Sequence, residues 1–196
     1  MSTVSECAHA LATAMNEDLS FVKQVARRLV DDGLLPKSSG RNFAHVDDGQ
    51  LSLLMLAVQT TDGFAASSKS ALAYGGLLFT GEAGELTLKD MLYRTFTACR
   101  EKSRVVINPE VSVHFLNLQF EITTSYPRAL IHDRPTFGEP VLDGALNFVM
   151  EGQKSRHWPN NFPHKSVLVP GQCFLAIIND LDAQQRVEKS IGKAST

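Results

Sequence analysis

The stretch Val25-Ala-Arg-Arg-Leu-Val-Asp-Asp-Gly-Leu-Leu-Pro-Lys-Ser-Ser-Gly-Arg41 combines a helical pattern, a helix stop and a turn. Apolar side chains at helical spacing in its first half predict the end of an amphipathic helix whose polar side carries adjacent arginines. Gly33 suits the left-handed conformation in which many helices end, and Pro36 prevents the helix from resuming. The Ser- and Gly-rich residues after Pro36 predict a turn. The segment therefore indicates a basic helix followed by a loop.

Two further helices flank this segment. The upstream helix is predicted by apolar residues at helical spacing, which are Val4, Cys7, Ala8, Leu11 and Met15. Thr3 and Glu6 have the spacing of a capping box at its start, and Asp18 is suited to cap the basic helix that follows. Downstream, Asp47 and Gln50 repeat the capping-box spacing before another apolar stripe. The first sixty residues are thus predicted to form three capped helices.

This order of a helix, a Gly-Leu-Leu-Pro segment, a basic turn and a capped helix resembles the winged helix-turn-helix DNA-binding domains of the MerR-like kind, over residues 2–60. The resemblance implies a winged helix-turn-helix domain at residues 1–62. Together with the residue patterns of the rest of the chain, this predicts an α+β fold in which that domain precedes helices and a small, mostly antiparallel sheet. MerR-like proteins often use ligand-binding cysteines or a long dimerisation helix. Neither is evident in this sequence, so their effector mechanism is not carried over.

The basic helix is predicted to face DNA. In a helix-turn-helix unit the second helix presents its polar side to the major groove. We expect Gln24 and Arg27 to contact base edges, because both side chains can form paired hydrogen bonds with a base. The other polar and cationic side chains of the helix and wing are expected at phosphates, where they position the protein, and they are Ser20, Lys23, Arg28, Lys37 and Arg41. The predicted partner is double-stranded DNA.

The charge of the chain is concentrated in this segment. The whole chain has a net charge of −2, which excludes a strongly basic protein of the histone type. Between Ser20 and His45, however, five cationic and two acidic residues give a local charge of +3. A monomer that neutralises about three to five phosphates has a predicted salt slope of about −3 to −5. We expect a homodimer, which doubles the contacts and permits a palindromic site.

The rest of the chain predicts an α+β domain at residues 69–187, after a polar linker at 61–70. Helices are expected at 70–79, 88–101 and 174–181, and strands at 128–132, 145–150 and 165–169. Apolar alternation from Val111 to Ile122 changes phase between Phe115 and Leu116, which predicts a bulge or strong twist there. Residues 188–196 are predicted to be a polar tail. A protein partner for this domain is an open possibility.

Several kinds of chemistry have no motif here. The sequence has no phosphate-binding Gly-Lys loop, nucleophile elbow, His-Glu-x-x-His or Cys-x-x-Cys motif, so we expect no enzyme, cofactor or metal. His157 and His164 flank an aromatic, proline-rich loop whose simpler interpretation is core packing. Three distant cysteines do not predict disulfides. No basic signal region or membrane-length apolar run is present, which predicts a cytoplasmic protein without a membrane partner.

We expect a sequence-specific DNA-binding protein, and a transcriptional regulator, of phage or prophage type, is the preferred hypothesis. A phage DNA-packaging recognition subunit with the same DNA-binding fold makes the same physical prediction, and the sequence does not separate the two. A protein-interaction or inhibitor module without DNA binding is the alternative from another class, because basic helical faces are often only solvated surface. DNA binding at two salt concentrations discriminates these classes.

Overall fold

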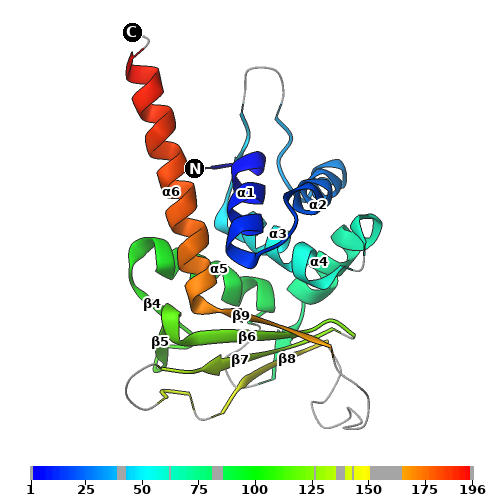
Figure 1. Ribbon diagram of the computed structural model, residues 1–196. Helices are drawn as coiled ribbons and strands as arrows, with labels where there is room; N and C mark the ends of the chain where they lie inside the picture. The colour runs from blue at the N-terminus through cyan, green and yellow to red at the C-terminus, as the bar shows by residue number, and fades with distance from the viewer. Residues whose placement is uncertain are drawn as a thin grey trace.

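Helices cover one face of an antiparallel β-sheet in this protein (Figure 1). The computed structural model describes residues 2–38, 43–61, 63–80, 86–125, 127–135, 140–142, 144–150 and 165–194. The expected α+β class with a small antiparallel sheet is therefore confirmed.

The first third of the chain forms the three helices that its capping patterns predict. They are α1 (Val4–Met15), α2 (Leu19–Asp31) and α3 (Asp48–Thr60). Capping boxes are present at Thr3 with Glu6 and at Asp47 with Gln50, so each side chain accepts a bond from the backbone N–H of the other residue. Strand β1 (Ser2–Thr3) pairs antiparallel with β2 (His45–Val46). This pairing holds the start of α1 beside the chain that enters α3.

The middle of the chain differs from its predicted boundaries. A 3-10 turn (η1, Phe64–Ala66) leads into α4 (Ser67–Gly75), which begins earlier and ends earlier than the helix expected at 70–79. Leu78–Phe79 form β3 instead. The reason is that the helix ends at the Gly75-Gly76 pair, after which Leu77 is buried in the core. Helix α5 (Leu88–Glu101) has the predicted bounds.

The main sheet has the strand order β3-β8-β7-β6-β9, with antiparallel pairing throughout. Its further strands are β6 (Leu118–Thr123), β7 (Arg128–Asp133), β8 (Leu146–Val149) and β9 (Ser166–Pro170). A separate hairpin joins β4 (Arg104–Val106) to β5 (Ser112–His114). The expected bulge is wrong: a 3-10 turn (η2, Phe115–Asn117) separates β5 from β6. This turn lets the two strands join different sheets and keeps both apolar faces buried.

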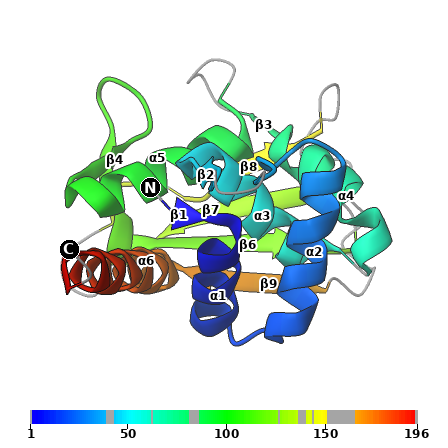
Figure 2. The ribbon, with the colours of Figure 1, turned by 90° about the horizontal axis from the view of Figure 1, so that it is seen from above.

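The last helix links the two ends of the chain. Helix α6 (Gly171–Ala194) follows β9 directly and packs along α1, and its C-terminal end extends past α1 (Figures 1 and 2). Its 24 residues make it about 36 Å long, so it continues far beyond the expected end at residue 181. Most of the predicted tail is therefore the end of a helix. A long helix, which the sequence patterns did not reveal, is thus present.

An ion-pair network ties the first helices to the rest of the molecule. Nη2 of Arg100 on α5 lies 2.8 Å from Oδ1 of Asp48 at the start of α3, and Nη1 lies 3.8 Å from Oδ1 of Asp182 on α6. Burial lowers the pKa of Arg100, but the hydrogen bond to Asp48 and the two carboxylate charges outweigh it and raise the pKa above its ordinary value. The guanidinium therefore stays charged and joins three helices.

Buried apolar side chains from α1 to α6 form one continuous cluster. Its largest fully buried side chains include Phe96, Phe120 and Phe174, whose rings are in contact between α5, the sheet and α6. The domain boundary between residues 62 and 69 stays a prediction. Among the described residues no helix combines the length and the apolar character needed to cross a membrane.

Candidate nucleic-acid interface

Both ends of α2 are held in place by local structure. Asn16, in the left-handed conformation with φ of 54°, ends α1, and the Asp18 side chain accepts a 2.8 Å bond from the N–H of Phe21 at the start of α2. At the other end Gly33 has φ of +76°, as its position in the sequence predicts. The N–H of Leu34 then bonds to the carbonyl of Leu29 at 2.8 Å. The helix is thus fixed relative to α1.

The buried side of α2 packs on its neighbours, and its polar side is open. Its fully buried side chains are Val22, Val25, Ala26 and Leu29. The helix lies at the outer side of the helical layer (Figure 2). The exposed side chains of the first two turns lie on one face, at the spacing i, i+3, i+4 and i+7, and they are Ser20, Lys23, Gln24 and Arg27. The structure therefore brings four of the predicted DNA-contacting residues together.

These four side chains and Leu19 line an open hollow of about 490 Å³. Nε2 of Gln24 lies 3.4 Å from Oγ of Ser20, which orients the amide along the helix. Lys23 and Arg27 take part in none of the ion pairs found among the described residues. Both cations are consequently available to an anionic partner on this face.

Arg28 is engaged differently from the other cations. Its Nε lies 2.9 Å from Oδ2 of Asp32, one helical turn further along. The two side chains are 48% and 31% exposed, so the pair contributes only about 0.3–0.5 kcal/mol to the stability of the helix. A phosphate can compete for Arg28 at this small cost.

A second hollow lies between the start of α1, α2 and the described residues on either side of positions 39–42, here called the two legs of the loop. Its volume is about 380 Å³, and Lys23 and Arg27 line it as well as the first hollow. Phe43 forms one wall and is 68% exposed. The side-chain oxygen of Ser38 accepts a 3.2 Å bond from the N–H of Ala44, which joins the two legs of the loop. Lys23 and Arg27 therefore border both hollows.

The loop differs from the expected hairpin wing in its described parts. Lys37 is exposed on the first leg, and Arg41 lies outside the described residues. Strand β2 pairs with β1 rather than with the other leg of the loop. The exposed Phe43 is not among the residues that the sequence patterns predicted at the DNA interface. A phenylalanine beside the polar turn residues was the available signal, since a side chain there lacks the alternating pattern of a half-buried strand.

The remaining reactive side chains lie apart from this face. Burial raises the pKa of Cys7 to about 12 and that of Cys99 to about 11, which keeps both thiols protonated and unreactive at neutral pH. Among the described residues no three His, Cys, Asp or Glu side chains are grouped as metal ligands. The loop from His157 to His164 lies outside the described residues.

Comparisons of the chain with family models, with curated proteins and with solved structures found no match. The resemblance of residues 2–60 to MerR-like domains therefore stays a prediction.

Proposed function

We propose that the chain is a sequence-specific DNA-binding protein that places α2 in the major groove and regulates transcription from the bound site. The observation that carries this proposal is the face formed by Ser20, Lys23, Gln24 and Arg27 on one side of an exposed helix. Two cations without ion-pair partners among the described residues flank an amide that can bond to a base edge.

The arrangement of α1 and α2 supports this proposal. A short turn of Asn16, Glu17 and Asp18 joins the two helices, and α1 packs against the buried side of α2. A first helix that supports a second, exposed helix is the arrangement by which helix-turn-helix proteins enter the major groove. The N-terminal end of α2 carries the proposed contacts, as such docking requires. In the proposal, Gln24 and Arg27 contact bases, while Ser20, Lys23, Arg28, Lys37 and Arg41 contact phosphates.

The modest local charge favours binding as a homodimer. One copy supplies a local charge of +3, which limits the phosphates that it can neutralise. Two copies double that number and place two α2 helices at neighbouring half-sites. Sedimentation of the protein with a DNA duplex measures whether the complex contains two copies, and a complex with one copy would contradict the dimer.

Fluorescence anisotropy with mixed genomic DNA fragments tests DNA binding at about 50 mM and about 200 mM salt. We expect binding that weakens steeply as salt increases. Arg27→Ala removes a proposed base contact and is expected to weaken binding to the preferred site by about 1–3 kcal/mol per bound copy. Lys23→Ala removes a proposed phosphate contact and is expected to lower the salt slope by about one per bound copy. Arg41→Ala tests the loop in the same way.

Lys165→Ala is the matched control, because it removes the same charge from an exposed residue beside β9, in the sheet layer. This variant should bind DNA as the wild type does. Absence of binding by the folded wild type, or equal losses in Lys165→Ala and Arg27→Ala, would overturn the proposal. Circular dichroism verifies that each variant is folded.

A further inference from the structure

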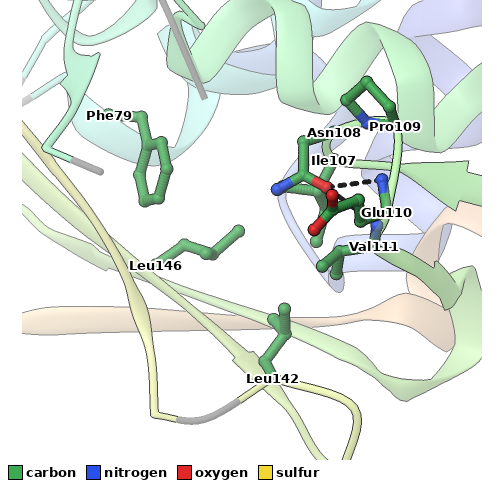
Figure 3. A pocket seen from close by; sticks show the side chains of 8 residues that line it. All are labelled: Phe79, Ile107, Asn108, Pro109, Glu110, Val111, Leu142 and Leu146. Atoms are coloured by element: carbon green, nitrogen blue, oxygen red, sulfur yellow. Dashed lines mark hydrogen bonds between the residues drawn. The ribbon is translucent and has the colours of Figure 1, made fainter. Parts of the chain in front are cut away.

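A pocket of about 500 Å³ lies between the β4–β5 hairpin and the edge of the main sheet (Figure 3). Phe79 of β3, Leu142 and Leu146 form one wall, while Ile107 and Val111 of the hairpin turn form the opposite wall. This volume is within the range of small-molecule sites in proteins, about 300–1,000 Å³. The pocket lies apart from α2, so it does not depend on the proposed DNA-binding face.

Both walls of the pocket are held by hydrogen bonds. Oδ1 of Asn108 accepts bonds from the N–H groups of Glu110 at 2.9 Å and of Val111 at 2.8 Å, which fixes the hairpin turn. On the opposite wall, Oδ2 of Asp133 accepts bonds from the N–H groups of Val141 at 2.6 Å and of Leu142 at 3.4 Å. These bonds restrain the hairpin turn and the segment at Leu142 on either side of the pocket, which reduces the conformational entropy lost on binding.

The polar groups of the pocket lie on the hairpin side. Because Oδ1 of Asn108 is occupied by the turn, its amide NH₂ group is the free end, and Figure 3 shows it directed toward the pocket. The Glu110 carboxylate lies beside it and takes part in no ion pair among the described residues. Arg94, the nearby cation, donates instead to the carbonyls of Val106 and Ile107.

We infer that this pocket binds a small organic amine with an apolar body. The apolar walls take up the body, and the Glu110 carboxylate pairs with the ammonium group at the hairpin side. A small carboxylic acid is disfavoured, because its charge would lie against Glu110. This inference does not rest on the proposed DNA binding, and either can fail without the other.

Titration with 2-phenylethylamine, followed by amide chemical shifts, tests the inference, and neutral 2-phenylethanol serves as the isosteric comparison. We expect shifts for the amides of the lining residues that carry a backbone N–H, which are Phe79, Ile107, Asn108, Glu110, Val111, Leu142 and Leu146. The amine should bind about two- to fivefold more tightly than the alcohol, the range of one partly exposed ion pair. In Glu110→Gln this preference should disappear while the alcohol binds as before.

Two controls keep the test specific. Glu101→Gln removes an exposed carboxylate from the end of α5 and should retain the preference for the amine. Leu142→Trp fills the pocket and should abolish binding of both compounds. Shifts that fall outside the pocket, or an amine preference that persists in Glu110→Gln, would overturn the inference. Glu110 is exposed, so its variant is expected to fold and carries the test by itself.

Discussion

Arg28 and Asp32 form an ion pair along the exposed side of α2, with 2.9 Å between Nε and Oδ2. If α2 binds DNA, the Asp32 carboxylate repels phosphates and also competes for the guanidinium. Asp32→Asn should therefore raise DNA affinity about two- to fivefold at low salt, and less at high salt, because screening weakens charges at the surface. Fluorescence anisotropy at both salt concentrations measures the change.

Asp31→Asn is the matched control for this prediction. Asp31 is exposed, neighbours Asp32 and takes part in none of the ion pairs of the described residues. Asp31→Asn removes the same single negative charge as Asp32→Asn, so its effect on DNA affinity measures only the general repulsion between the protein and the phosphates. An equal gain in affinity for both variants would show that release of Arg28 contributes nothing.

Gln24→Ala should reduce specificity without reducing the salt dependence. The amide carries no charge, so its removal releases no counterion, whereas a lost base contact costs about 1–3 kcal/mol of discrimination. Lys23→Ala should show the opposite pattern, a smaller salt slope with a similar loss on every sequence. Selection of sites from a randomised duplex, followed by anisotropy, separates the patterns. A steeper or shallower salt slope in Gln24→Ala would contradict a base-contacting role.

Gly171→Ala should destabilise the protein severely. Gly171 begins α6, and a Cβ atom there would collide with the carbonyl oxygen of Phe115 and lie 3.0 Å from Cα of Leu116. Both neighbours are backbone atoms in η2, so relief requires the helix and the turn to separate. We expect a loss of roughly 3 kcal/mol in the free energy of unfolding, measured by urea denaturation. Gly63→Ala, where nothing lies within 4 Å of the new Cβ, should be nearly neutral.

Stability should decrease at alkaline pH because of the buried thiols. An unperturbed thiol has a pKa of 9.0, whereas burial raises the pKa of Cys7 to about 12 and of Cys99 to about 11. Above about pH 9 the unfolded chain therefore releases protons that the folded chain retains, and the folded state loses up to about 1.4 kcal/mol per pH unit for each thiol. The contribution of the protonated buried thiols to the free energy of unfolding is fully present below about pH 9, and it is lost as the pH rises through the folded pKa values.

Urea unfolding at about pH 8 and about pH 10 measures this decrease. Cys7→Ala and Cys99→Ala should each show a smaller decrease than the wild type, although both variants start from a lower stability because they remove buried volume. A decrease in both variants equal to that of the wild type would assign the alkaline loss to other groups.

The local features of the N-terminal third were predictable because they depend on neighbours in the sequence. A capping box joins residues three apart, and a glycine at a helix end is favoured by its own backbone conformation. The helices that begin after Thr3, Asp18 and Asp47 therefore start where these signals place them. The common exposure of Lys23 and Arg27 follows equally from helical spacing.

The boundaries of helices and strands were less predictable where a stretch of sequence fits two local structures. The apolar alternation from Val111 to Ile122 predicted a bulge or a strong twist within one strand. The chain instead leaves one sheet and enters another there, because β5 pairs with β4 while β6 pairs with β7 and β9. Likewise, Leu78 and Phe79 fit a helical pattern but pair with Val149 and Phe148 in the sheet. In both cases the pairing with a partner strand sets the boundary of the element, and the neighbouring residues in the sequence do not indicate where that partner strand lies.

The sequence by itself determined the starts of α1, α2, α3 and α5, the mixed α+β class and the polar composition of the exposed side of α2, because each depends on residues a few positions apart. Tertiary structure alone decided which distant segments meet: α6 lies along α1, Arg100 joins Asp48 to Asp182, and the pocket beside Glu110 takes walls from three separate segments. Such contacts form when apolar faces from across the chain are buried together, and their free energy depends on the complete fold rather than on any one stretch of residues.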